Sequence, residues 1–338
     1  MKQSFFSFLI VALLITTLNN VQAQSGYKVS KTFHVASAGG WDYIAVNAAS
    51  NKLYLSHGTQ VNILDKTTGD SLGIIPNTTG VHGIAFNNTL GKGYTSNGRI
   101  NTVTVFDLKT DKVLSQIATG ENPDAIMYDA VSKKIITCNG RSKDLTIIDA
   151  ATEKVVATIA VGGKPETAVT DEAGKLFVNI EDKNEIVVID LSTNKIINHW
   201  SLAPGDGPSG LVIDTKTKRL FATCEKLLVV MDATNGKVID KLPIGNGTDG
   251  AAIDLSAQLI FTSNGEGTVT VVKENSATEF KVLETVATKK GARTICIDDA
   301  THKLYLPTAD FEPLPAGAGE RARPKPIAGS FQVLVLEK

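Results

Sequence analysis

Residues 123–159 read PDAIMYDAVSKKIITCNGRSKDLTIIDAATEKVVATI, which is a series of four short apolar runs separated by turns. The runs are rich in β-branched residues, and each has the length of about four to six residues that is typical of strands. Asp129 opens the first turn, where an Asp side chain can bond the backbone two residues further on. The pattern predicts four antiparallel strands that follow one another in one small sheet.

The same pattern occurs seven times along the chain, at intervals of about 40–45 residues. The third strand of each unit is the clearest, as in Val103–Asp107 and Ile186–Asp190. Four antiparallel strands in a repeat of this length are typical of one β-propeller blade, so the sequence predicts an all-β, seven-bladed β-propeller. The units begin at Trp41, Val81, Pro123, Pro165, Pro208, Thr248 and Ala292.

The two ends of the chain are expected to complete one blade together. The seventh unit has no fourth strand, because the chain ends just after Val333–Leu336. Residues 27–33, ahead of the first unit, carry the fourth-strand pattern, with Lys28 followed by Val29. We therefore expect the N-terminal strand to close the last blade, which would pair an otherwise open sheet edge.

The second strands and their exits share one pattern, which reads YLSH, YTSN, ITCN, FVNI and FTSN at Tyr54–His57, Tyr94–Asn97, Ile136–Asn139, Phe177–Ile180 and Phe261–Asn264. This resembles the Tyr-Val-Thr-Asn repeat of the YVTN-type, YncE-like β-propellers, over essentially all of residues 27–338. Units four, five and seven depart at the final position, where Ile180, Cys224 and Thr308 replace Asn, and unit one has His57 there. The resemblance implies the fold and includes periplasmic proteins, some of which are thought to bind DNA. It does not imply one function, because the family contains binding, structural and cofactor-associated proteins.

Residues 1–23 have the pattern of an export signal. Lys2 precedes an apolar run of about 14 residues, and the segment ends with Val21 and Ala23 at the −3 and −1 positions of a cleavage site. That run is shorter than the 20 or so residues that span a bilayer. We expect residues 24–338 to form a single exported domain, periplasmic or secreted, monomeric and without a transmembrane segment.

Composition and charge narrow the function classes. The chain has 34 Lys and Arg residues against 35 Asp and Glu residues, for a net charge of −1. This excludes a strongly basic nucleic-acid binder, and the lysines are scattered over the turns, so nucleic-acid binding is not expected. The three cysteines lie in apolar strands and are expected to be buried. No Cys-x-x-Cys-His motif occurs, which excludes covalent haem.

A polar ring is expected where the first strands meet at the channel of the propeller. The residues at the starts of these strands are ionisable in six of the seven units, whereas the residues directly after them are small or apolar. Carboxylates predominate in this ring, and they suit a divalent cation or another positively charged group. Alternatively, the side chains only hydrate the channel mouth. The candidate ligand-binding residues are Asp42, His82, Asp124, Glu166, Asp249 and Arg293 of the first strands, His57, Asn97, Asn139 and Asn264 at the second-strand exits, and Trp41, which could stack on a ligand.

Three functions stay open. We expect a binding protein without catalytic residues, which takes a small molecule, a cation such as calcium or a protein partner at the acidic mouth. The alternative is a metal-dependent, lactonase-like hydrolase in which Glu166 or Asp249 is the base and His82 or His57 the acid. The chain has neither a zinc-type His pair nor a Gly-x-Ser-x-Gly elbow. The third function is that of a DNA-binding or purely structural propeller.

Residues 309–330 break the repeat with a long insertion in the last blade. Long loops inside compact domains are usually functional or disordered. Arg321, Arg323 and Lys325 give this loop the charge to lie across the acidic mouth as a lid or to dock a partner. A loop with no role is the alternative.

Overall fold

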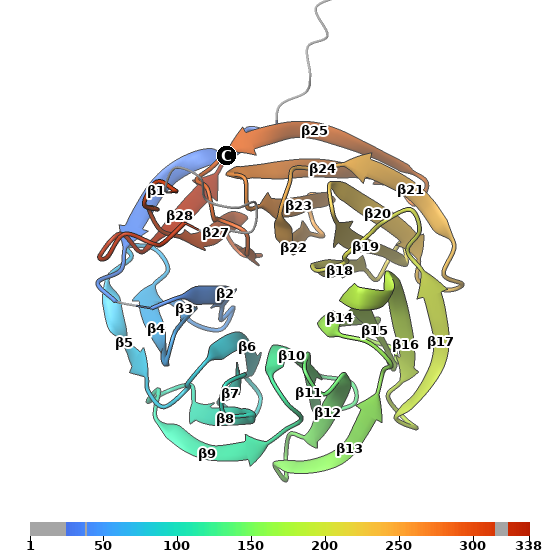
Figure 1. Ribbon diagram of the computed structural model, residues 1–338, viewed down its shortest axis with the longest axis horizontal. Helices are drawn as coiled ribbons and strands as arrows, with labels where there is room; N and C mark the ends of the chain where they lie inside the picture. The colour runs from blue at the N-terminus through green and yellow to red at the C-terminus, as the bar shows by residue number, and fades with distance from the viewer. Residues whose placement is uncertain (1–24, 38, 315–323) are drawn as a thin grey trace, which may run out of the picture.

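The structure is a computed structural model that describes residues 25–37, 39–314 and 324–338. Seven four-stranded antiparallel sheets stand around one centre (Figure 1). The predicted all-β, seven-bladed β-propeller is therefore confirmed. Within the described part of the chain, the one helical element is the short 3-10 helix η1 (Glu181–Lys183).

The first four blades each run in chain order from the innermost to the outermost strand. Blade one contains β2 (Trp41–Val46), β3 (Lys52–His57), β4 (Gln60–Asp65) and β5 (Ser71–Ile75). Blade two contains β6 (Val81–Asn87), β7 (Lys92–Asn97), β8 (Thr102–Asp107) and β9 (Val113–Ala118). Blade three contains β10 (Pro123–Asp129), β11 (Lys134–Asn139), β12 (Asp144–Asp149) and β13 (Lys154–Ala160). Blade four contains β14 (Pro165–Thr170), β15 (Lys175–Ile180), β16 (Glu185–Asp190) and β17 (Lys195–Ser201).

The remaining three blades complete the ring. Blade five contains β18 (Leu211–Asp214), β19 (Arg219–Cys224), β20 (Leu227–Asp232) and β21 (Val238–Pro243). Blade six contains β22 (Thr248–Asp254), β23 (Leu259–Asn264), β24 (Thr268–Ser276) and β25 (Glu279–Ala287). Blade seven contains β26 (Cys296–Asp298), β27 (Lys303–Thr308), β28 (Gln332–Glu337) and, from the other end of the chain, β1 (Lys28–His34).

Blade seven is closed as the sequence predicts. Strand β1 pairs antiparallel with β28, from Lys28 opposite Glu337 to His34 opposite Gln332. Figure 1 shows β1 (blue) beside β28 (red) at the rim of the ring. The first and last strands of the chain are therefore held in one sheet, and the ring has no unpaired edge at this junction.

The core lies between the blades. The second and third strands of each sheet are almost wholly buried, whereas the outermost strand is exposed or partly exposed at most positions, as β12 and β13 illustrate. Side chains of neighbouring blades share one apolar cluster, such as Ile136 and Leu145 of blade three with Val178 and Val187 of blade four. Burial of these faces on both sides of each sheet is the main stabilising contribution to the ring.

A β-bulge interrupts five of the innermost strands, β2, β6, β10, β14 and β22, close to their first residues. In β2 the pairing moves from Trp41 to Ile44, which leaves Asp42 and Tyr43 outside the ladder. Bulges re-aim side chains and commonly lie next to functional sites. Here they fall at the positions where the sequence predicts the polar ring.

The blade-seven insertion leaves β27 at Thr308 and returns to β28 at Gln332. A single bridge between Phe311 and Pro326 ties its two ends together. Arg321 and Arg323 lie outside the described residues, and so does the predicted export signal of residues 1–23.

Among the residues that the structure does describe, no helix is long and apolar enough to cross a membrane. All three cysteines are free thiols; Cys138 and Cys224 are buried.

Candidate functional site

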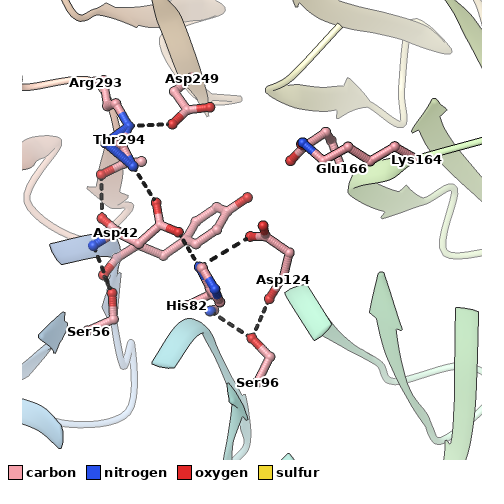
Figure 2. A network of polar contacts seen from close by, with 12 residues as sticks. Asp42, Ser56, His82, Ser96, Asp124, Lys164, Glu166, Asp249, Arg293 and Thr294 are labelled. Atoms are coloured by element: carbon pink, nitrogen blue, oxygen red, sulfur yellow. Dashed lines mark hydrogen bonds and ion pairs between the residues drawn. The ribbon is translucent and has the colours of Figure 1, made fainter. Parts of the chain in front are cut away.

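Three predicted ring residues from three blades converge at the centre of the propeller. Asp42, His82 and Asp124 each offer one ligand atom, and these atoms all lie within 4.8 Å of one another. His82 Nδ1 lies 2.6 Å from Asp42 Oδ2 and 3.8 Å from Asp124 Oδ1. Figure 2 shows the three side chains pointing toward one another. We call these three residues the Asp–His–Asp cluster.

Arg293 joins this cluster to a fourth ring residue. Its Nε donates a hydrogen bond to Asp249 Oδ2 at 2.6 Å, and its Nη2 donates one to Asp42 Oδ1 at 3.1 Å. Thr294 Oγ1 donates to the backbone carbonyl of Asp42 at 2.6 Å, while the Asp42 N–H donates to Ser56 Oγ at 3.1 Å. These contacts fix Asp42 from both its side chain and its backbone, and they leave its Oδ2 to His82.

Glu166 belongs to a second group, on the neighbouring innermost strand β14, and Figure 2 draws no contact between it and the cluster. Its carboxylate accepts a hydrogen bond from the ammonium group of Lys164, which also bonds Glu181. Lys164 was not among the predicted site residues, because it stands two positions ahead of the ionisable start of its strand. The predicted ring is thus divided into an Asp–His–Asp cluster with Arg293 and Asp249, and an ion-paired Lys164 group.

Close approach of neighbouring blades brings His82 and Asp124 together. A Cβ atom on Gly83 would lie 2.9 Å from the backbone nitrogen of Ile126 and 3.1 Å from the carbonyl oxygen of Asp124. Such distances are too short for a side chain, so glycine is required at this position. The small residue after His82, visible in the sequence, therefore reflects contact between β6 and β10.

Burial and like charge shift the acids of the site. Burial raises the pKa of Asp124 to about 6, and the charges of Asp42 and Asp249 add to this, while His82 opposes it. Burial also raises the pKa of Glu166 to about 8, although its ion pair with Lys164 acts in the other direction. The carboxylates thus outnumber the positive charges that could stabilise their ionised forms.

His82 carries more positive charge than an isolated histidine. Burial lowers its pKa, but the hydrogen bond to Asp42 and the charges of Asp124 and Asp42 outweigh that effect, so the net pKa is raised. The protonated form of the ring is therefore favoured, and in that form it places positive charge between the carboxylates of Asp42 and Asp124. A cation that binds between Asp42 and Asp124 would compete with this proton.

Tyr43 is a site residue that sequence reasoning missed. It follows Asp42 directly, at a position where the other strands carry small or apolar residues. Burial raises the pKa of its phenol well above the usual range, and the charges of Asp124, Asp42, Glu166 and Asp249 raise it further. The phenol therefore stays neutral in the midst of the carboxylates. The signal that could have identified Tyr43 is that it is aromatic, whereas the other units have a small residue at the same position of the repeat.

The structure gives the predicted second-strand residues other contacts. Asn97, Asn139 and Asn264 are fully buried within their blades. The Nδ2 of each donates hydrogen bonds to the third strand of the same sheet, as Asn97 does to Thr102 and Thr104 at 3.1 and 2.8 Å. Their amide groups tie two strands together, so we leave them out of the proposed site.

His57 and Trp41 belong to an aromatic group beside the blade-seven insertion. The His57 ring nitrogens bond Ser37 Oγ at 2.5 Å and the Gly39 carbonyl oxygen at 2.9 Å, and the ring stacks on Phe331 at 4.0 Å. Trp41 packs against Phe331 at 5.3 Å and also against Phe311. Burial lowers the pKa of His57, which is consistent with a neutral packing residue.

Comparisons with known proteins agree with this architecture. The sequence profile of a family described as outer membrane protein assembly factor BamB matches residues 99–307. Among solved structures, Kuenenia stuttgartiensis hydrazine synthase is similar with a TM-score of 0.71 and 15% sequence identity. The match covers 81% of this chain and 94% of that chain, and at this identity it shows the fold alone. No curated protein matches the sequence.

Proposed function

This chain belongs to the family of the outer membrane protein assembly factor BamB, and from that membership and the geometry of the ring centre we propose that it is an exported binding protein that takes up a positively charged ligand. The ligand binds at the Asp–His–Asp cluster. The family places the chain among β-propellers, whereas the cluster supplies the chemistry. Fold and function are separate arguments, because one propeller fold carries many functions.

One observation carries the proposal: Asp124 faces the centre without a hydrogen-bonding partner. Among the described residues, no donor lies within hydrogen-bond distance of its carboxylate oxygens, and the nearest cationic atom is His82 Nδ1 at 3.8 Å. The side chain is 17% exposed and so is reachable from solvent. A largely desolvated carboxylate that accepts no hydrogen bond, and whose one ion-pair contact among the described residues is the 3.8 Å contact with His82, is stabilised by an incoming positive charge.

The charge balance of the ring supports the same function. Asp42, Asp124, Glu166 and Asp249 face two permanent cations, Arg293 and Lys164. Lys164 is engaged by Glu166 and Glu181, which leaves Arg293 and the titratable His82 for the remaining three acids. A bound cation would neutralise the excess negative charge of these acids. Oxygen ligands from Asp42 and Asp124 suit a hard divalent ion or an ammonium group.

Isothermal titration calorimetry tests the proposal. Purified protein is titrated at pH 8 with Ca²⁺, with Mn²⁺ and with methylammonium, because each probe presents positive charge in a different form. Asp124→Asn should weaken binding of the best probe at least tenfold, since it removes the carboxylate charge that accepts no hydrogen bond. Glu279→Gln, an exposed change on the distant β25, should leave binding unchanged. If none of the three cations binds the wild-type protein, the proposal fails.

Export and the closer family relationship are parts of the same proposal. The charged start, short apolar run and small residues of positions 1–23 support export, as does a family named for outer membrane protein assembly. The pattern at Tyr94–Asn97 supports a closer relationship to the YVTN-type, YncE-like propellers. Periplasmic recovery of a chain whose mass begins after Ala23 would support export, and cytoplasmic recovery of the intact chain would contradict it.

A further inference from the structure

A small apolar cavity is lined by residues that directly follow the members of the Asp–His–Asp cluster in the chain. It has a volume of about 110 Å³. Tyr43, Gly83, Ala125 and Thr167 line it, and each of them directly follows a ring residue, namely Asp42, His82, Asp124 or Glu166. The cavity is therefore formed by the next residues along the same innermost strands that carry the polar ring.

The wall of the cavity is made mainly of hydrocarbon. Ile44, Ile84, Met127 and Ile136 are among its lining residues, from the first strands of blades one to three and the second strand of blade three. Cys138 also lines the cavity, is 1% exposed and has no hydrogen-bond partner among the described residues. Burial raises the pKa of its thiol well above the usual range, so it remains uncharged. Such a space favours an apolar group over water.

Tyr43 connects the cavity to the acids. Its side chain lines the cavity and also packs with the blade-three and blade-four core, although the residue comes from blade one. The same phenol experiences the charges of Asp42, Asp124, Glu166 and Asp249. One side chain therefore borders both regions, and a ligand that occupied both would contact it.

We propose that the ligand of this site is a short aliphatic ammonium ion, with its charged nitrogen between Asp42 and Asp124 and its hydrocarbon chain in the cavity. This rests on the proposed cation binding and specifies the ligand class. A bare metal ion would use the carboxylates and leave the apolar cavity empty. At about 30 Å³ per water-sized group, 110 Å³ holds a chain of about three or four carbon atoms.

The test is a series of n-alkylammonium ions, from methyl to hexyl, titrated into the full protein by calorimetry at one pH and ionic strength. Each methylene buried in the cavity should strengthen binding about fourfold. The gain should continue to about butyl and then stop or reverse, because the cavity is full. A binding constant that does not change between methyl and butyl would overturn the proposal, as would binding of Ca²⁺ or Mn²⁺ with no binding of any ammonium ion.

A cavity-filling variant sharpens the test. Ala168 lines the cavity, so Ala168→Leu should reduce the ratio of butylammonium to methylammonium affinity to near one. Ala130→Leu, which adds the same atoms at an exposed turn, should keep the wild-type ratio. The chain-length series on the wild-type protein decides the proposal even if Ala168→Leu does not fold. The two proposals fail differently: absence of all cation binding removes both, whereas cation binding without chain-length dependence removes only this one.

Discussion

His82 Nδ1 lies 2.6 Å from Asp42 Oδ2, although the two residues are 40 positions apart in the chain. The separation equals one blade, so neighbouring blades bring together the same position of successive repeats. The contact therefore follows from the repeat itself. The role that we propose for this pair depends on Asp124, which lies one blade further on. The Asp124 carboxylate accepts no hydrogen bond among the described residues, and His82 Nδ1 is 3.8 Å away from it.

We expect Asp124→Asn to stabilise the protein while it weakens cation binding. The folded-state pKa of Asp124 is raised by burial to about 6, from an ordinary value of 3.8. An acid with a raised folded-state pKa costs stability once it is ionised, that is, as pH rises from about 4 to above 6. Removing the charge should raise the free energy of unfolding by about 1–3 kcal/mol at pH 8.

Urea denaturation of both proteins at pH 8 and pH 4 checks this expectation. The difference between them should be large at pH 8 and much smaller at pH 4, where Asp124 is protonated in the folded state and only partly ionised in the unfolded state. A variant that is less stable than wild type at pH 8 would show that Asp124 is a structural residue. Gain of stability with loss of binding is typical of a site kept under electrostatic strain for its ligand.

Cation affinity should rise with pH from about 6 to 8. Burial raises the pKa of Asp124 to about 6 and that of Glu166 to about 8, so both carboxylates lose protons in this window. Protons and the cation compete for the carboxylate oxygens of Asp124, whereas Glu166, outside the Asp–His–Asp cluster, favours the cation only through its charge; binding below pH 8 should therefore release protons. Titrations in two buffers of different ionisation enthalpy measure the release. Identical heats in both buffers would exclude this linkage.

A buried acid far from the ring centre gives a third prediction. Glu274 of β24 is fully buried, and neither of its carboxylate oxygens has a hydrogen-bond partner among the described residues. Burial raises its pKa; the neighbouring Thr217 hydroxyl opposes this, but the charge of Asp214 adds to it and the net pKa is raised. The folded state therefore holds the proton more tightly than the unfolded state, and stability falls as pH rises above the ordinary pKa of Glu.

Glu274→Gln should consequently stabilise the protein at pH 8 by on the order of 1–2 kcal/mol, because it removes a buried, unpaired charge. Glu279→Gln, on the exposed strand β25 of the same hairpin, is the matched control and should have almost no effect. Thermal unfolding at pH 5 and pH 8 measures both. Equal effects of the two substitutions would show that Glu274 is hydrated or paired in solution.

The fold could be predicted from the sequence because the same four-strand pattern occurs seven times, once for each blade. A strand such as Val103–Asp107 is buried on both faces and ends in a turn, so its β-branched run is continuous. The N-terminal partner of β28 was predictable too, because residues 27–33 repeat the fourth-strand pattern. Both features are local patterns, and local patterns are visible in one sequence.

The composition of the site was predictable, but its contacts were not. Six ring positions could be read from the register, yet the pairing of Arg293 with Asp42 joins residues 251 positions apart and depends on closure of the ring. Lys164 lies two residues before the position that is ionisable in most repeats, so the repeat pattern did not identify it. The lysines scattered over the turns include Lys52, whose ammonium group bonds the Leu108 carbonyl oxygen at 3.1 Å and Asp111 at 2.7 Å in the next blade. Such contacts between blades can be identified only from the three-dimensional structure.

Closure of blade seven gives the last prediction, in which deletion of residues 27–36 abolishes the cooperative fold. The deletion removes β1, exposes the fully buried β28 as an open edge and takes away Phe33, a core side chain. It also removes Tyr27, which packs edge-on against Phe261 of blade six at 5.0 Å. The loss exceeds what a domain stable by about 5–15 kcal/mol tolerates. In thermal unfolding, the control chain that begins at Ser25 should show one sharp transition. An unchanged midpoint in the deletion variant would mean that β1 is not needed to hold the ring closed.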